Sequence, residues 1–434
     1  MKTVTTDPAG TPSATADGLP ARVEEALGEL AGAAKEGLMA LSVATGLGVL
    51  HELMAAEVDE VVGPKGKHNP DRTAKRHGHE ETSVTLGARR VAVSRPRVRS
   101  ADDADEVSLE TFSHFAARDP LAAVVLERML AGVSTRRFGR TQEPVGEEIE
   151  AQERSTSKSS ISREFVAKTA ENLAALMSRR LDDVRLAVLM LDGIELKGRC
   201  CVVALGITTE GIKIPLGLWE GSTENAAVAT ALLADLVDRG LDTSQGVLCV
   251  IDGAKALRKA VRDVLGERTP VQRCVRHKER NVLDHLPERA RPAVRRRLRA
   301  AWALECHETA QERLEALASE LERSHPGAAA SLREGLEETI AVIRLGVGGA
   351  LKRTLSSTNP CESMIECVRR SSRNVKRWRS GDMCLRWTAA GMLEAERQFR
   401  KVIGYRELAT LAVAIEREVT TASSSPTAAP VVVA

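Results

Sequence analysis

Two short stretches decide the fold: Leu186-Ala-Val-Leu-Met-Leu-Asp-Gly193 and Val247-Leu-Cys-Val-Ile-Asp-Gly253. Each is an unbroken apolar run followed by Asp-Gly. Unbroken apolar runs of this length are typical of strands that are buried on both faces of a sheet. The sequence therefore predicts two buried strands, each ending at a carboxylate, Asp192 or Asp252.

The segments around these runs predict a mixed sheet. Residues 199–208 and 212–219 are further apolar runs joined by short glycine-containing connections, so they form an antiparallel meander with residues 186–191. Helical periodicity covers residues 223–239 and 254–265, and residues 270–274 form a short fifth strand. The order β-β-β-α-β-α-β predicts an α/β fold with a mixed five-stranded sheet and helices on both faces.

In this topology the first and fourth strands are parallel neighbours, so Asp192 and Asp252 come together at one edge of the sheet. Ligands bind at such carboxyl ends in open α/β sheets. Two adjacent carboxylates repel each other unless a cation lies between them, and oxygen ligands suit Mg²⁺ or Mn²⁺. The alternative, that each Asp-Gly only makes a turn, is favoured for either residue alone. The pair together favours a metal site.

A third acid comes from residues 356–366, which contain Glu362 and Glu366. We expect Asn359 to cap a helix in which Pro360 occupies the first position. Glu362 then falls where a capping box places its glutamate, which is the structural alternative to metal binding.

Basic residues continue from Glu366 along the same expected helix, over residues 360–379. Arg369, Arg370, Arg373 and Arg377 share one face at helical spacing. A carboxylate at the head of a basic face suits a metal site from which a polyanion such as DNA extends. The alternative is that these arginines pair with acidic helices in residues 275–345.

Cys274 and His277 have the spacing of metal ligands, and Cys306-His307 could complete a zinc set. A buried cysteine beside a hydrogen-bonded histidine is the structural alternative.

The N-terminal part contains two candidate DNA-binding features. Residues 65–99 are rich in Lys and Arg, and the alternation in residues 84–98 predicts a basic hairpin or ribbon, with a solvated charged strand as the alternative. The serine-rich residues 155–163 resemble the turn of a helix-turn-helix motif, with Lys158 and Arg163 near the start of the following helix. An ordinary capped helix is the alternative.

Composition limits the remaining possibilities. The 434 residues carry a net charge of only +2, so local clusters matter more than overall charge. No uninterrupted apolar window of membrane-spanning length and no secretory signal are present, and eight scattered cysteines indicate reduced thiols in the cytosol. We expect the following parts: 1–20 and 419–434 disordered tails, 21–180 DNA-binding region, 181–274 first part of the core, 275–350 helical insertion, 351–418 completion of the core with C-terminal helices.

The motifs together resemble the prokaryotic Mutator-like insertion-sequence transposases. They are Leu191-Asp-Gly193, Val250-Ile-Asp-Gly-Ala-Lys255, Cys274-x-x-His277, Ser357-Thr-Asn-x-x-Glu-Ser363, Asn374-Val-Lys-Arg-Trp-Arg379 and Leu385-Arg-Trp387. The resemblance implies an RNase H-like fold with a helical insertion and a DDE triad, which by motif is Asp192, Asp252 and Glu362. It also implies that Cys274 and His277 support the active site, because the family carries a Cys-x-x-His pair after the second Asp. Pro360-Cys361 before the glutamate leaves Glu366 as the alternative third acid.

This resemblance and the carboxylates define the expected function. We expect a DDE transposase that uses two Mg²⁺ or Mn²⁺ ions to cleave element ends and to transfer the 3′-OH strand to target DNA. An RNase H-like metal nuclease without strand joining, or a catalytically dead DNA-binding regulator, is the alternative. The expected partners are double-stranded DNA, as terminal inverted repeats and target, and further copies of the chain, as a homodimer or higher oligomer. The expected location is cytoplasmic and nucleoid-associated, with no membrane partner.

Overall fold

The computed structural model describes residues 39–67, 72–145, 149, 151, 157–221, 225–244 and 246–421. Their contacts divide into two compact units, residues 1–168 and 169–434. Helix α6 (Lys158–Ser178) contains the boundary between them.

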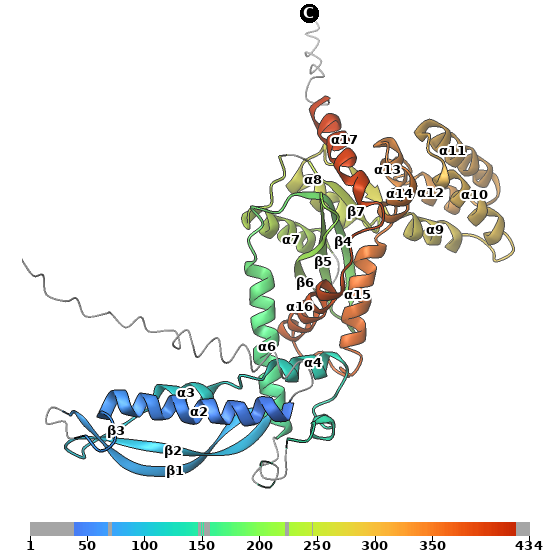
Figure 1. Ribbon diagram of the computed structural model, residues 1–434. Helices are drawn as coiled ribbons and strands as arrows, with labels where there is room; N and C mark the ends of the chain where they lie inside the picture. Colours follow the sequence, from blue (N-terminus) through green and yellow to red (C-terminus); the bar gives the residue numbers. More distant parts are fainter. Residues whose placement is uncertain are drawn as a thin grey trace, which may run out of the picture. The chain divides into compact units, whose positions relative to one another are not determined.

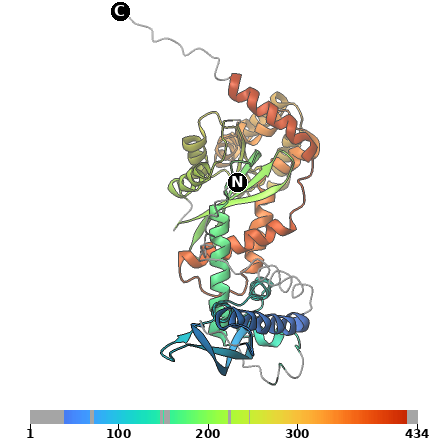
Figure 2. The same cartoon turned by 60° about the vertical axis from the view of Figure 1, so that its left-hand side comes forward.

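Unit 1 is built on a long β-hairpin and one helix. β1 (Ala74–Leu86) and β2 (Arg89–Ser100) pair antiparallel, and β3 (Glu106–Val107) extends the sheet beside β2. Helix α2 (Met39–Val62) lies along the hairpin in two views (Figures 1 and 2). α2 is long and apolar enough to cross a membrane by length and composition, but Val43, Leu50 and Met54 are buried in the core of unit 1. The remaining elements are α3 (Glu110–Ala117), α4 (Ala123–Leu130) and η1 (Phe138–Thr141).

The hairpin turns at Gly87 and Ala88, which both have positive φ angles, 60° and 62°. A two-residue turn of this kind matches the twist of the paired strands. The buried carboxylate of Asp119 accepts hydrogen bonds from Gly87 N (2.8 Å), Ala88 N (2.7 Å) and Leu121 N (2.9 Å). Burial raises the pKa of Asp119 to about 6, although the three amides oppose the rise. The predicted hairpin is therefore confirmed, with a carboxylate holding its turn.

Much of the positive charge of the hairpin is paired within unit 1. Arg95 contacts Glu106 at 2.9 Å, and Arg97 contacts the same glutamate at 2.8 Å. Lys75 pairs with Asp103. The hairpin therefore carries less net positive charge than its Lys and Arg content indicates.

Unit 2 contains the predicted five-stranded mixed sheet. Its strands are β4 (Leu186–Glu195), β5 (Cys200–Thr208), β6 (Lys213–Gly221), β7 (Leu248–Ile251) and β8 (Val271–Arg273), in the order β6-β5-β4-β7-β8. β4, β5 and β6 form the antiparallel meander, while β7 is parallel to β4 and β8 to β7. The prediction that β4 ends at Asp192 is wrong. The strand runs on to Glu195 because Asp192 pairs with Val203 and Gly193 with Val202 of β5.

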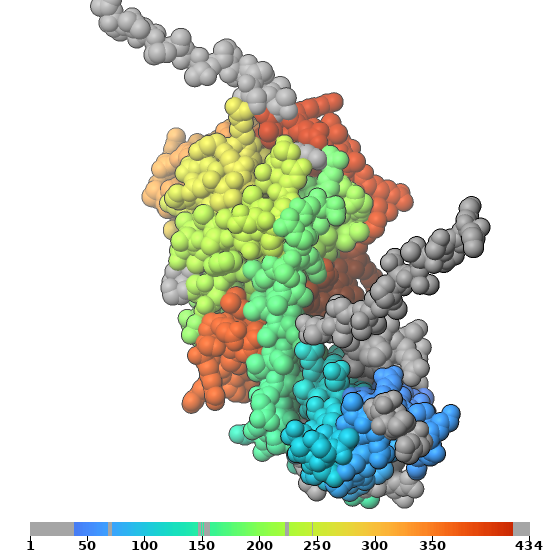
Figure 3. All heavy atoms as spheres, turned by 90° about the vertical axis from the view of Figure 1, so that its left-hand side faces the viewer, coloured from blue at the N-terminus to red at the C-terminus, as the bar shows by residue number. Residues whose placement is uncertain are grey.

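Helices cover both faces of this sheet, as predicted. α7 (Ala226–Asp238) and α8 (Lys255–Leu265) pack on the face that includes Leu189 and Leu191, and Figure 3 looks onto these two helices. The opposite face, with Val188 and Met190, packs against α14 (Gly349–Leu355), α15 (Asn359–Ser371), α16 (Gly381–Gln398) and α17 (Leu408–Thr421), which η3 (Tyr405–Glu407) precedes. All eight cysteines lie in the described residues, and no disulfide joins them.

The predicted helical segment between β8 and α14 forms a subdomain with its own apolar core. It comprises α9 (Val275–Asp284), α10 (Arg291–Ala303), α11 (His307–Ser324), α12 (Pro326–Arg333), η2 (Glu337–Thr339) and α13 (Ala341–Arg344). Two buried lysines bind helix ends there: Lys278 Nζ donates to Ser331 O (2.7 Å) and Glu334 O (2.6 Å), and Lys352 Nζ donates to Ala303 O (2.8 Å). A cation at the end of a helix also meets the negative pole of its dipole.

The Asp119→Ala variant should lose about 3–5 kcal/mol of unfolding free energy, because three buried backbone amides lose their acceptor. Thermal or urea unfolding of the full chain measures the loss. The control is Glu81→Ala, an exposed acid on β1, which should change stability by less than about 0.5 kcal/mol. Equal stability of the two variants would show that Asp119 does not hold the turn.

Candidate active site at the carboxyl end of the sheet

The backbone register brings Asp192 and Asp252 together. Leu191 pairs with Ile251 between the parallel strands β4 and β7, so the next residue of each chain segment lies at the same level. Asp192 lies two residues after Met190 on the strand, so both side chains point to the same face of the sheet, which α15 covers. Asp252 Oδ1 accepts a hydrogen bond from Ala254 N at 2.8 Å. Asp252 thus makes a turn, as the alternative interpretation has it, while its carboxylate stays at the sheet edge.

Helix α15 brings Glu362 to this edge. The helix begins one residue earlier than predicted: Thr358 is the N-cap, and Asn359 is already helical. Thr358 Oγ1 donates to Glu362 Oε1 at 3.2 Å, and Glu362 N donates to Thr358 O at 2.8 Å. The capping-box alternative is wrong, because it required Glu362 to accept from the amide of an Asn359 cap.

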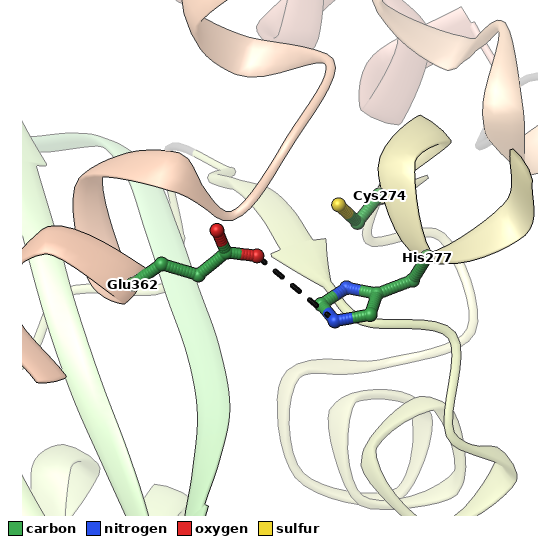
Figure 4. Close-up of side chains that lie close together, drawn as sticks. All are labelled: Cys274, His277 and Glu362. Atoms are coloured by element: carbon green, nitrogen blue, oxygen red, sulfur yellow. Dashed lines mark ion pairs between the residues drawn. The ribbon is translucent and has the colours of Figure 1, made fainter. Parts of the chain in front are cut away.

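Cys274 and His277 approach from the third parallel strand. Cys274 N donates to Ile251 O at 2.8 Å, so this cysteine lies beside the end of β7. His277 occupies the first turn of α9, and its Nε2 lies 3.9 Å from Glu362 Oε1 (Figure 4). Ligand atoms of Cys274, His277 and Glu362 all lie within 4.8 Å of one another. In the described part of the chain, Cys306 belongs to no such group, so the four-residue zinc set does not assemble.

A cavity of about 550 Å³ opens over Asp192, His277 and Glu362. Its lining includes the titratable side chains of Asp192, His277, Glu362 and Glu366 and two arginines, Arg280 and Arg369. The other lining residues are Gly193, Asn359, Ser363 and Ile365. No ion pair involves either arginine among the described residues. Sequence reasoning missed Arg280, although its position three residues after His277 on one helix was a usable signal.

Electrostatic interactions link the groups in this cavity. Burial, followed by the charge of Asp252, raises the pKa of Asp192 to about 6. The adjacent Cys274 side chain raises the pKa of His277, and the Asp192 and Asp252 charges add to the effect. Burial opposes ionisation of Cys274, but His277 and nearby amides lower the pKa of this thiol overall. Even so, the buried Nδ1 of His277 has no partner with normal hydrogen-bond geometry in the described residues.

The predicted continuous basic helix face is shorter than expected. α15 ends at Ser371, so Arg369 and Arg370 lie on the helix while Arg373 and Arg377 follow it. Ser372 is the C-cap of this helix, and Trp378, further along the chain, packs against the core of the sheet.

Arginines of α10 pair with acids of the insertion itself. Arg297 and Arg299 of α10 pair with Glu320 and Glu279, which also belong to the insertion. Within the described residues, Arg369 and Arg377 form no ion pair. The alternative in which the insertion neutralises the basic segment is therefore wrong for these two residues.

Lys158 and Arg163 are exposed in the first turns of α6, in unit 1. Ser157 Oγ accepts a hydrogen bond from Ser160 N at 3.1 Å, which is the hydrogen bond of an ordinary N-cap. Residues 152–156, which contain the start of the predicted helix-turn-helix turn, lie outside the described residues.

Comparison with known proteins identifies the family. Residues 23–402 match the family described as Transposase, Mutator family. The chain is 28% identical over 369 residues to the transposase for insertion sequence element ISRM5 of Rhizobium meliloti, covering 82% of this chain and 88% of that protein. It is 25% identical over 344 residues to the transposase for insertion sequence element IS256 in transposon Tn4001 of Staphylococcus aureus, covering 76% and 83%. The chain belongs to the Mutator family of transposases.

The raised pKa of Asp192 predicts a measurable cost in stability. Between pH about 3.9 and about 6, unfolded Asp192 has lost its proton while folded Asp192 keeps it. The unfolding free energy of the metal-free protein therefore falls as pH rises through this window, by up to about 3 kcal/mol. In chelator at pH 7, Asp192→Asn should be more stable than wild type by up to that amount, and the gain should vanish at pH 4.

Urea unfolding at the two pH values measures this effect. Asp183→Asn, which changes an exposed aspartate in the loop before β4, should leave stability unchanged at both. If the Asp192→Asn variant were less stable than wild type at pH 7, the raised pKa of Asp192 would be contradicted.

Proposed function

We propose that this chain is a DDE transposase whose catalytic acids are Asp192, Asp252 and Glu362, on an RNase H-like sheet. The observation that carries the proposal is the parallel register of β4 and β7, which brings two acids 60 positions apart in sequence to one level. The strand order and the helical insertion before α15 support the same fold. Glu362 is favoured over Glu366 because it lies 3.9 Å from His277 and its charge contributes to the raised pKa of Asp192.

The donor set suits hard divalent cations. All three acids offer carboxylate oxygens, the ligands that Mg²⁺ and Mn²⁺ prefer. The proposed site holds two ions about 3.5–4 Å apart, as in other two-metal sites. In the described part of the chain the three acids do not form a group within 4.8 Å of one another, so their side chains would move to bind the ions. When bound, two such ions supply Lewis-acid activation of the attacking and leaving oxygens of a DNA phosphodiester.

The side chains around the acids can bind and position DNA. Arg280 on α9 and Arg369 on α15 present guanidinium groups that form no ion pair with any described residue, from two elements of the cavity. Guanidinium groups bind phosphate oxygens without reading sequence. His277 Nε2 lies 3.9 Å from Glu362 Oε1, and the Cys274 sulfur lies within 4.8 Å of the ligand atoms of both. In this proposal the arginines bind DNA phosphates and the acids bind the metal ions. The scissile phosphate is thereby fixed in position, so that catalysis comes mainly from positioning.

The reaction has two chemically similar steps. Hydrolysis at an element end frees a 3′-OH, and that hydroxyl then attacks a phosphodiester of target DNA. We expect unit 1, including Lys158 and Arg163, to recognise the terminal inverted repeats. A homodimer or higher oligomer is expected because two ends must be joined, and the cytoplasmic nucleoid is the expected place of action.

Asp192→Asn, Asp252→Asn and Glu362→Gln should each abolish end cleavage and strand joining in Mg²⁺, because each removes one carboxylate ligand while keeping shape and volume. Labelled element ends with a free 3′-OH and a target plasmid measure both steps, and the joining step separates a transposase from a nuclease. Binding of the ends should persist, measured by mobility shift in Ca²⁺.

Glu366→Gln is the matched control, since Glu366 lines the same cavity one turn later. It should keep at least about a tenth of wild-type cleavage. Loss of activity in Glu366→Gln together with activity in Glu362→Gln would reverse the assignment of the third acid. Full wild-type cleavage in EDTA would refute metal dependence.

Arg280→Ala should weaken DNA binding equally for all sequences and flatten the log–log salt dependence by about 0.9, the value for one phosphate contact. Cleavage should fall further than binding, because the scissile phosphate loses its position. Arg276→Ala is the control: Arg276 is exposed on α9 but does not line the cavity. Identical salt slopes for the two variants would remove Arg280 from the DNA path.

A further inference from the structure

Cys274, His277 and Glu362 bring a thiol, an imidazole and a carboxylate within 4.8 Å of one another (Figure 4). We propose that these three side chains form a binding site for a borderline transition-metal ion of the Zn²⁺ class, which shares Glu362 with the hard-metal site of the three acids. The effect on catalysis rests on the proposed function, whereas the binding site itself does not.

The ligand types set this site apart from the carboxylate site. Zn²⁺ and Co²⁺ bind thiolate sulfur and imidazole nitrogen, whereas Mg²⁺ keeps to oxygen ligands and water. Three protein ligands, one each from Cys, His and Glu, leave the fourth tetrahedral position open, as in zinc sites that exchange a ligand. The cavity of about 550 Å³ gives solvent access to that position.

The geometry needs only a small closure. With zinc bonds of about 2.0–2.3 Å, tetrahedral ligand atoms lie about 3.5 Å apart. His277 Nε2 and Glu362 Oε1 are already 3.9 Å apart. Cys274 is fully buried, and its backbone is held by Ile251, so the sulfur is a fixed point. Glu362, with 40% of its side chain exposed, can supply the remaining movement.

A second observation points to a ligand at this place. His277 has a buried Nδ1 with no normal hydrogen-bond partner in the described residues. A buried ring nitrogen without a partner costs free energy, and its persistence in a native site calls for an explanation. Metal binding through Nδ1 would supply this partner, and the ring would then turn so that Nδ1 rather than Nε2 faces Glu362.

Binding has a definite chemical balance and a definite consequence. The metal ion forms bonds to sulfur, nitrogen and oxygen, and the thiol proton of Cys274 goes to solvent. An oxygen of Glu362 that holds zinc is withdrawn from the carboxylate site. Zinc should therefore inhibit cleavage in Mg²⁺, and raising Mg²⁺ should relieve the inhibition.

Cobalt(II) added to the metal-free full-length protein tests the site without reference to catalysis. Wild type should bind one Co²⁺ with a near-ultraviolet thiolate-to-cobalt charge-transfer band, and Zn²⁺ should displace it. Cys274→Ser should remove the band, and His277→Ala should weaken Co²⁺ affinity at least about tenfold. Melting curves of both variants establish that they are folded.

Cys306→Ser is the matched control, because Cys306 is an exposed cysteine next to His307 that lies outside the group. It should keep both the band and zinc inhibition of cleavage. No thiolate band in wild type, or a band lost in Cys306→Ser but kept in Cys274→Ser, would overturn the proposal. These outcomes differ from failure of the proposed function, which would appear as cleavage by the Asp192→Asn variant.

Discussion

The parallel pairing of β4 with β7 is the interaction on which the rest of unit 2 depends. It sets Leu191 opposite Ile251, and this register places the next residues, Asp192 and Asp252, at the same level of the sheet. The apolar residues of both strands are buried on both faces. Burial of each such side chain contributes about 1.5–3 kcal/mol. This gain offsets the cost of holding Asp192 buried beside a second acid, a cost that shows in its raised pKa.

Helix α9 joins the carboxylate edge of the sheet to the rest of the helical insertion. His277 reaches into the carboxylate cavity, while the next residue, Lys278, binds the carbonyls at the end of α12. Burial lowers the pKa of Lys278 to about 8, so its charge is costly and its two carbonyl partners matter. Gln272 on β8 adds a second link, accepting from Val342 N at 2.9 Å. The insertion is therefore fixed to the strand that carries Cys274, and movement of one would displace the other.

Sequence reasoning predicted the sheet because its signals are local. Apolar runs, glycine punctuation and connection lengths determine strand order without knowledge of distant contacts. It failed where a distant contact overrode a local signal. The Asp192-Gly193 pair indicates a strand end, but pairing with β5 continues the strand. The charge pattern after Glu366 indicates a longer helix, but α15 ends at Ser371, and Trp378 beyond it packs against the core of the sheet. Arg280 was missed although it lies three residues after His277 on one helix, because the segment holds many other arginines and the spacing alone did not distinguish this one.

The ion pairs of the structure show which charged side chains are neutralised by a neighbour, and composition alone does not show this. The hairpin of unit 1 looks basic in sequence, yet Glu106 alone pairs with two of its arginines. The insertion is rich in arginine, yet Glu279 alone accepts from Arg295 and Arg299. Exposed pairs of this kind add little stability, but they cancel the local field. Arg280 and Arg369, which form no ion pair in the described part of the chain, lie beside the acids of the cavity, and their guanidinium groups are therefore available to bind an anionic group such as a phosphate.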